Sequence, residues 1–108
     1  MTKIFAHRGA SAYAPENTME AFELAAKQGA DGIELDVHVT KDGEVVVTHD
    51  EKIDRVSNGS GFIKDMTLRE LKRLSFHNHM ESYVGVGIPT LREVLEYVST
   101  TNMDVNIE

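Results

Sequence analysis

The chain has 108 residues, 41% of them hydrophobic and 27% charged, which is typical of one small globular domain. Its net charge of -7 argues against nucleic acid or an anionic membrane surface as the main partner. The absence of cysteine excludes a disulfide framework, a thiolate metal site and a cysteine nucleophile. The sequence shows no signal-peptide pattern and no apolar run near the roughly 20 residues that span a bilayer. We therefore expect a cytoplasmic protein without stable membrane insertion.

The first third of the chain predicts a strand, a loop, a helix and a second strand. Lys3 to Ala6 is short and apolar, which predicts a buried strand that ends at His7. Asn17 is expected to cap the following helix, with Glu20 completing a capping box, and Gly29 is expected to end it. This order of elements within about 30 residues is typical of a βαβ unit, so we predict an α/β fold with a parallel sheet.

Residues 33–40 alternate between apolar and polar side chains, which predicts one strand with two distinct faces. Glu34 and Asp36 would share the polar face of this strand. The Asp-Gly pair at 42–43 predicts a two-residue hairpin turn. In the resulting register Asp36 lies opposite His49, with Cβ atoms about 4.5–5.5 Å apart.

Residues 51–89 form a longer segment that is polar and rich in glycine, and we expect no continuous core within it. Thr67 and Thr90 each precede the sequence Leu-Arg-Glu, which predicts two helices that begin with capping boxes. Residues 104–108 alternate again and predict a further strand.

Glu34 and Asp36 carry the strongest local chemical signal. Two residues apart on a strand, they would lie roughly 7 Å apart along one face. Such a pair of carboxylates suits a hard cation such as Mg²⁺ or Ca²⁺. The alternative is a solvated strand face, which is less favoured in a parallel sheet because both faces are usually covered. His38 has the same parity but lies farther along, and we expect it at the rim.

The sequence His7-Arg8-Gly9 lies where the first strand ends, the position at which α/β folds place reactive groups. A histidine there can act as a general acid or base, and an arginine can bind a phosphate through two hydrogen bonds. His49 is a second candidate because the predicted hairpin directs it toward Asp36.

Several short motifs occur in the order seen in glycerophosphodiester phosphodiesterases: Ala6-His7-Arg8-Gly9, Pro15-Glu16-Asn17-Thr18, Glu34-Leu35-Asp36-Val37, Thr40-Lys41-Asp42-Gly43, Val47-Thr48-His49-Asp50, Thr67-Leu68 and Ile88-Pro89-Thr90-Leu91. The chain resembles this family over nearly its whole length. The resemblance implies a (β/α)₈ TIM barrel of phosphodiesterase type. The chain would supply roughly the first three βα units, with barrel strands near residues 3–7, 32–38 and 104–108.

The resemblance implies metal-dependent hydrolysis of glycerophosphodiesters to glycerol 3-phosphate and an alcohol, within lipid and glycerol metabolism. It assigns roles to six residues: an acid/base pair, His7 and His49; a phosphate-binding residue, Arg8; and three ligands of Mg²⁺ or Ca²⁺, Glu34, Asp36 and Glu108. Residues 51 to about 89 resemble the family's inserted segment over the barrel mouth. Which histidine is the acid, which metal binds and which alcohol leaves all stay open.

A whole barrel typically needs about 250 residues. We therefore expect residues 1–108 to be the N-terminal part of a single barrel domain. Exposed sheet edges and helix faces would favour self-association. Two alternatives remain: a related barrel phosphodiesterase of phospholipase type, and a non-catalytic partial barrel that needs complementation.

Overall fold

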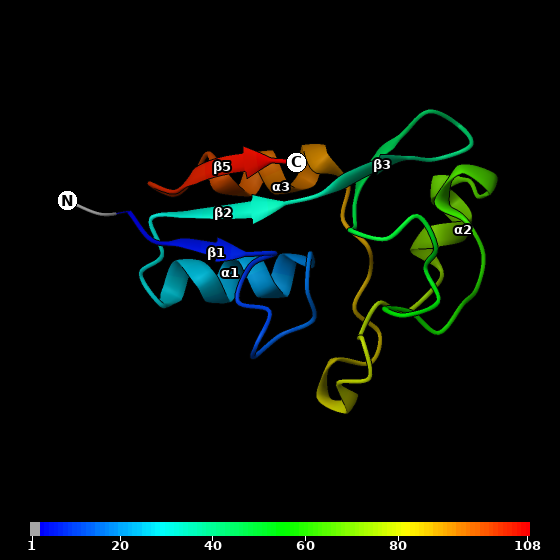
Figure 1. Cartoon of the computed structure of the whole chain (residues 1–108), viewed down its shortest axis with the longest axis horizontal. Helices are drawn as coiled ribbons and strands as arrows, with labels where there is room; N and C mark the ends of the chain where they lie inside the picture. Colours follow the sequence, from blue (N-terminus) through cyan, green and yellow to red (C-terminus); the bar gives the residue numbers. More distant parts are fainter. Residues whose placement is uncertain (1–2) are drawn as a thin grey trace.

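The computed structural model describes residues 3–108; Met1 and Thr2, on which the expectation about a signal peptide partly rests, lie outside the described residues. A three-stranded sheet is built from β1 (Phe5–His7), β2 (Gly32–Leu35) and β5 (Asp104–Ile107) in the order β1-β2-β5. Both strand pairs are parallel, so the predicted parallel α/β sheet is confirmed (Figure 1).

Two helices, α1 (Met19–Lys27) and α3 (Leu91–Val98), pack against one face of this sheet. Ile33 and Leu35 of β2 point into the core between sheet and helices and are only 0% and 1% exposed. Because successive side chains of a strand point to opposite faces, Glu34 lies on the face that the helices leave uncovered. The odd-numbered residues of the predicted alternation, Ile33 and Leu35, are therefore the residues of β2 that pack into the core.

The cap of α1 differs from the prediction by one residue. Thr18, not Asn17, is the N-cap, and its hydroxyl accepts a hydrogen bond of 3.2 Å from the backbone N–H of Ala21. Thr18 has the extended backbone of an N-cap, whereas Asn17 has a positive φ of 56°. Gly29 has a φ of 80° and follows the end of the helix, as predicted.

The prediction of one continuous strand over residues 33–40 is wrong, because the strand is interrupted at Asp36. Beyond it, β3 (Val37–Val39) leaves the parallel sheet and pairs antiparallel with β4 (Val45–Val47). Figure 1 shows this hairpin projecting beyond the carboxyl ends of the parallel strands. The alternation of buried apolar and exposed polar side chains ends there too, since Val39 is 55% exposed and Thr40 is only 4% exposed.

The predicted hairpin register is also wrong by one residue. The N–H of Thr40 donates to the carbonyl of Glu44 at 2.8 Å, so three residues rather than two form the loop. Asp36 consequently lies opposite Thr48, whose N–H donates to the Asp36 carbonyl at 2.9 Å, and not opposite His49. A shift of one residue in register exchanges the faces of a strand.

The expectation that residues 51–89 lack a continuous core is wrong. A second hydrophobic cluster joins this segment to the β3–β4 hairpin, and its buried members are Val46, Ile53, Val56, Ile63, Leu71, Phe76 and Ile88. Their irregular spacing in sequence gives no periodic signal, because they lie mostly in loops and short helices. These helices are η1 (Ile63–Asp65), α2 (Leu68–Lys72) and η2 (Glu81–Tyr83).

The two predicted capping boxes are confirmed at the starts of α2 and α3. The hydroxyl of Thr67 accepts a hydrogen bond from the Glu70 N–H, and that of Thr90 accepts one from the Glu93 N–H. In each case the glutamate side chain returns to the backbone N–H of the threonine.

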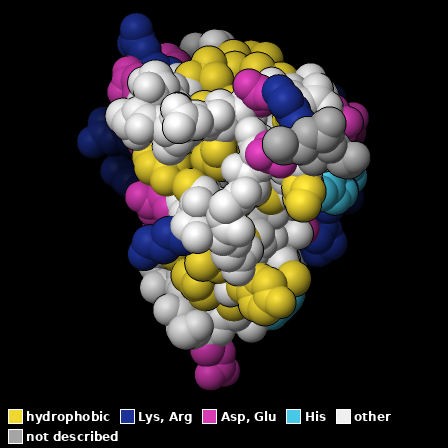
Figure 2. Space-filling model, turned by 90° about the vertical axis from the view of Figure 1, so that its left-hand side faces the viewer, with side chains coloured by type: hydrophobic (Ala, Val, Ile, Leu, Met, Phe, Trp, Pro, Cys, Tyr) yellow, Lys and Arg dark blue, Asp and Glu magenta, His cyan; other side chains and the backbone are white. Residues whose placement is uncertain are grey.

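Within residues 3–108, no helix has the length and hydrophobicity needed to cross a membrane. Figure 2 views the molecule from the side of the N-terminal strand ends and shows hydrophobic side chains in several separate patches. The carboxyl ends of the strands, which carry the predicted site residues, lie on the side away from that view.

Gly9 offers a test of the packing between the loop after β1 and α1. A Cβ atom at Gly9 would lie 2.8 Å from the carbonyl carbon and the Cβ of Ala21, and its φ is 79°. Gly29 has a similar φ of 80° but nothing within 4 Å of such a Cβ. Gly29→Ala should cost about 1–2 kcal/mol for the left-handed backbone alone. Gly9→Ala should cost about 1–3 kcal/mol more because of overpacking.

Urea unfolding followed by circular dichroism measures both free energies of unfolding. Equal losses in the two variants would show that the contact between the loop and α1 is not tight.

Candidate functional site

The register of the parallel sheet places three predicted site residues on its uncovered face. His7 pairs with Glu34, and Glu34 pairs with Asn106. The N–H of Glu108 donates to the Leu35 carbonyl at 2.8 Å, which continues this ladder to the end of the described chain. Residues aligned across parallel strands point to the same side, so Glu34 and Asn106 share a face with His7. Glu108 lies two residues beyond Asn106 and therefore points to that face as well.

Asp36 lies just past the end of β2, where the chain turns into the hairpin. Its Oδ2 is 3.3 Å from Nδ2 of Asn17, which donates a hydrogen bond, and 3.6 Å from Nε of Arg8. The Asp36 side chain is 14% exposed, so it is a largely buried carboxylate that has found cationic and amide partners.

Arg8 is fixed between two carboxylates. Its Nη1 donates to Oε2 of Glu16 at 3.1 Å, and its Nε lies beside Asp36 but makes no hydrogen bond with any residue of 3–108. The backbone of Arg8 has a φ of 57°, an uncommon value for a residue other than glycine. Its N–H donates to the Glu34 carbonyl at 2.8 Å, which ties the loop to β2. Such strained residues cluster at functional sites.

His49 is exposed and is oriented by two neighbours. Its Nδ1 lies 2.9 Å from Oδ1 of Asp50, and because a carboxylate only accepts, Nδ1 carries the proton. A neutral His49 therefore presents Nε2 as a proton acceptor. The Nε2 of His38 donates to the backbone carbonyl of His49 at 2.9 Å. His38 thus fixes the loop that carries His49. The prediction placed His38 at the rim and did not foresee this contact.

Arg55 holds the two acidic residues next to these side chains. Its guanidinium donates to both oxygens of Glu16, at 2.7 and 3.0 Å, and to both oxygens of Asp50, at 2.9 and 3.2 Å. This bonding by Arg55, helped by the hydrogen bond from His49, holds the pKa of Asp50 at about 2 although burial opposes the shift. Burial raises the pKa of Glu16, but Arg55 and Arg8 together outweigh it and the net pKa is lowered.

No three His, Asp or Glu side chains of residues 3–108 are close enough together to form a metal site. The chemistry of the donors nevertheless fits a hard cation, because Glu34, Asp36 and Glu108 are all carboxylates. The carboxylate of Glu34 makes no side-chain hydrogen bond or ion pair within this part of the chain. The assignment of these three residues as ligands remains a prediction.

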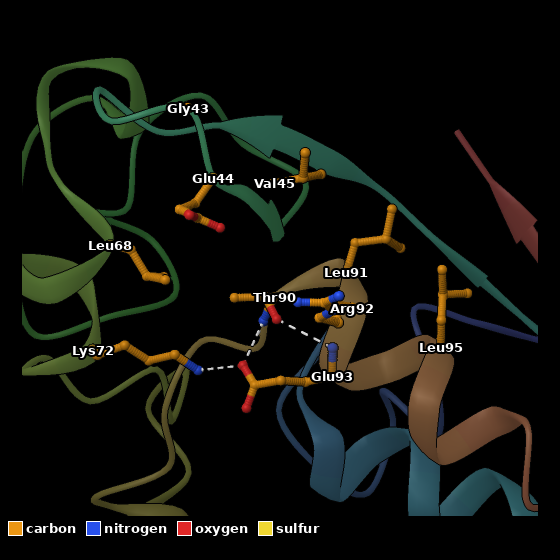
Figure 3. A pocket seen from close by; sticks show the side chains of 10 residues that line it. All are labelled: Gly43, Glu44, Val45, Leu68, Lys72, Thr90, Leu91, Arg92, Glu93 and Leu95. Atoms are coloured by element: carbon orange, nitrogen blue, oxygen red, sulfur yellow. Dashed lines mark hydrogen bonds and ion pairs between the residues drawn. The ribbon is translucent and has the colours of Figure 1, made fainter.

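A groove of about 690 Å³ lies between the β3–β4 hairpin, α2 and α3. Figure 3 shows its apolar side chains, among them Leu68 and Leu91, with the ion pair between Lys72 and Glu93 at 2.6 Å crossing it. Its lining residues do not include any of the predicted site residues. The groove is therefore separate from the strand ends that carry the candidate chemistry.

Sequence reasoning missed residues that support the site: Glu16, Asn17, His38, Asp50 and Arg55. Asn17 is 3% exposed. The two consecutive polar residues before the helix, Asn17 and Thr18, could have indicated from the sequence a role beyond capping. Arg55 gave no local signal, since it lies 39 residues from Glu16. Only the fold brings these two residues together.

The model of the glycerophosphoryl diester phosphodiesterase family matches residues 7–108. The chain belongs to this family. A glycerophosphodiester phosphodiesterase of Caldanaerobacter subterraneus is 53% identical over 108 residues, covering 99% of the chain and 44% of that protein. One of Bacillus altitudinis is 54% identical over 110 residues, covering 100% of the chain and 45% of that protein.

Solved structures of the family have the same fold as the chain. A glycerophosphodiester phosphodiesterase of Agrobacterium tumefaciens matches with a TM-score of 0.94 at 42% identity, covering 99% of the chain and 46% of that structure. A phosphodiesterase of Oleispira antarctica in complex with sn-glycerol-3-phosphate matches with a TM-score of 0.94 at 38% identity, covering 99% and 44%.

The chain therefore has the α/β fold of part of a glycerophosphodiester phosphodiesterase TIM barrel. It spans less than half the length of the curated relatives described above. Three barrel strands and two covering helices lie within the described residues.

The ion pairs of Asp50 predict a dependence of stability on pH. Because the pKa of Asp50 falls from 3.8 to about 2 on folding, its ionised form stabilises the fold above about pH 4, and this contribution is lost as the pH falls through about 2. Asp50→Asn should thus be less stable than the wild type near pH 5, and the difference should shrink toward pH 2. Thermal unfolding across this range measures the difference.

Glu96→Gln removes one negative charge from an exposed position and serves as the control. A stability difference for Asp50→Asn that stays constant down to pH 2 would contradict the proposed contribution.

Proposed function

We propose that the protein is a metal-dependent phosphodiesterase that hydrolyses glycerophosphodiesters to glycerol 3-phosphate and an alcohol. The observation that carries the proposal is the parallel register that aligns His7 with Glu34 at the strand ends of a chain of this family. The structure of the Oleispira antarctica phosphodiesterase with sn-glycerol-3-phosphate supports a substrate with a glycerol phosphate end.

In this proposal His7 and His49 form the acid/base pair. One histidine withdraws the proton of the attacking hydroxyl as its oxygen bonds to phosphorus, and the other donates a proton to the alkoxide oxygen that leaves. The bond from His49 Nδ1 to Asp50 supports its part, because it leaves Nε2 to exchange the proton. The proposal leaves open which histidine acts first.

Glu34, Asp36 and Glu108 would hold the divalent cation, Mg²⁺ or Ca²⁺. When bound there, such a cation supplies Lewis-acid polarisation of a phosphoryl oxygen. The carboxylate of Glu34 has no side-chain partner among residues 3–108, and Glu34 shares a face with Glu108; both observations support this assignment. Asp36 would contribute Oδ1, since Oδ2 is engaged by Arg8 and Asn17.

Arg8 would contact the phosphate with the part of its guanidinium that Glu16 and Asp36 leave free. Among residues 3–108 its guanidinium makes one hydrogen bond, from Nη1 to Glu16, and Nε lies beside Asp36, which leaves Nη2 for the phosphate. Residues 51–89 would act as an inserted segment of the single domain that shapes the pocket for the substrate. The position of this segment beyond the carboxyl ends of the strands supports that role (Figure 1). We place the activity in the cytoplasm and in lipid and glycerol metabolism.

A non-catalytic, self-associating partial barrel is the second candidate. Ile4, Leu95 and Ile107 are 69%, 40% and 46% exposed, and β1 and β5 form the edges of the sheet. Sedimentation velocity of the chain measures association, and a monomer at all concentrations would contradict self-association.

An assay that compares glycerophosphocholine with phosphatidylcholine vesicles as substrates separates the proposed activity from that of a phospholipase-type enzyme.

Replacing either histidine should abolish most of the turnover. We expect His7→Ala and His49→Ala each to lower kcat by about 100-fold or more, the usual contribution of a general acid or base. The measurement uses the natural protein at its full length with glycerophosphocholine. His79→Asn, at an exposed loop position, is the control. Near-native turnover of a variant would remove that histidine from the pair, and an inactive wild type would favour the non-catalytic candidate.

Neutralising Glu34 should weaken metal binding. Glu34→Gln removes a charged oxygen ligand, and we expect a loss of about tenfold or more in affinity for Mg²⁺ or Ca²⁺. Isothermal titration calorimetry measures the affinity. Glu23→Gln, at an exposed position of α1, keeps the charge change without touching the strand ends. An unchanged affinity in Glu34→Gln would reject the ligand assignment.

A further inference from the structure

Arg55 connects the loop after β1 to the segment after β4, which are far apart in the sequence. Glu16 follows β1, Asp50 follows β4, and Arg55 belongs to residues 51–89. Arg55 uses four hydrogen bonds to grip both carboxylates, with two bonds to each. Such paired bonds fix the orientation of both partners, which a single flexible contact does not.

Each carboxylate gripped by Arg55 also binds a predicted site residue. Oε2 of Glu16 accepts from Arg8 at 3.1 Å, and Oδ1 of Asp50 accepts from His49 at 2.9 Å. Arg55 is therefore two hydrogen bonds away from the candidate phosphate ligand on one side and from the candidate acid/base group on the other. His7 precedes Arg8 in the same strand end.

Stability alone does not account for this arrangement. The Arg55 side chain is 45% exposed, so solvent screens part of its attraction for Glu16 and Asp50. Glu16 is only 9% exposed on its side chain, so it needs a cationic partner, and Arg8 already provides one. The second cation, Arg55, has a geometric effect: it fixes the distance between the loop after β1 and the loop after β4.

We propose that Arg55 is a positioning residue, which sets Arg8 and His49 in their working orientations by holding Glu16 and Asp50 at once. Arg55 itself makes no contact with the substrate in this proposal. The inference rests on the proposed function for its catalytic consequence. Its structural part, the grip on both carboxylates, is testable without any activity.

The structural part is tested by carboxyl ¹³C NMR of the chain. In Arg55→Gln the pKa of Asp50 should rise from about 2 toward 3.8, because the hydrogen bond from Arg55 is the main cause of its low value. Arg92→Gln is the matched control, since the ion-pair partner of Arg92 within residues 3–108 is the highly exposed Glu96, at 3.8 Å. An Asp50 carboxyl that titrates identically in wild type and Arg55→Gln would overturn the proposal.

The catalytic part is tested by kinetics of the natural protein at its full length. We expect Arg55→Gln to lower kcat by about 10- to 100-fold, as removal of groups that orient an active side chain does. Arg55→Lys should recover little of this, because a lysine keeps the charge but lacks the planar fork that grips two carboxylates. Full recovery by lysine would show that charge alone is needed and would overturn the positioning role.

Two outcomes separate the possible failures. Thermal unfolding checks that Arg55→Gln is folded at the assay temperature; unchanged kcat per folded molecule, with Arg92→Gln as reference, would overturn positioning. A wild type that does not hydrolyse glycerophosphocholine would contradict the proposed function. The NMR result would still decide whether Arg55 holds Asp50.

Discussion

Parallel pairing of β1, β2 and β5 is the constraint on which the rest of the structure depends. It decides that His7, Glu34 and Glu108 share the face of the sheet that α1 and α3 leave open. The helices cover the other face, so the apolar side chains of β2 are used for the core and its polar side chain is free for chemistry. The contacts of Arg8 with Glu16 and Asp36 then form between the loops that start at the carboxyl ends of β1 and β2, where α/β folds generally bind their ligands.

Much of this framework could be predicted from local patterns. The parallel sheet, the two threonine capping boxes and the helix stop at Gly29 all follow from local patterns, and the structure confirms them. The candidate pair Glu34 and Asp36 also followed from the alternation of residues 33–40. Family membership adds the wider context, but the chemical roles of these residues remain predictions.

The errors arose where distant residues decide the conformation. A three-residue loop instead of a two-residue turn moves Asp36 from His49 to Thr48, and this loop is bonded to a distant residue, since the N–H of Lys41 donates to the Met66 carbonyl. The second core joins residues of irregular spacing, so periodicity could not detect it. The grip of Arg55 on Glu16 spans 39 residues and exists only once both loops are folded. Sequence patterns therefore indicate which residues could react, and the fold reveals what holds them.

The two separate hydrophobic clusters imply two cooperative folding units. Local opening in proteins often follows such units, each with its own free energy. The unit around Ile53 and Leu71 carries Arg55, whereas the unit around the sheet carries Arg8 and Glu34. Opening of the first unit would release Asp50 and His49 while leaving the parallel strands intact. Such an opening would separate these two residues from Arg8 without unfolding the sheet.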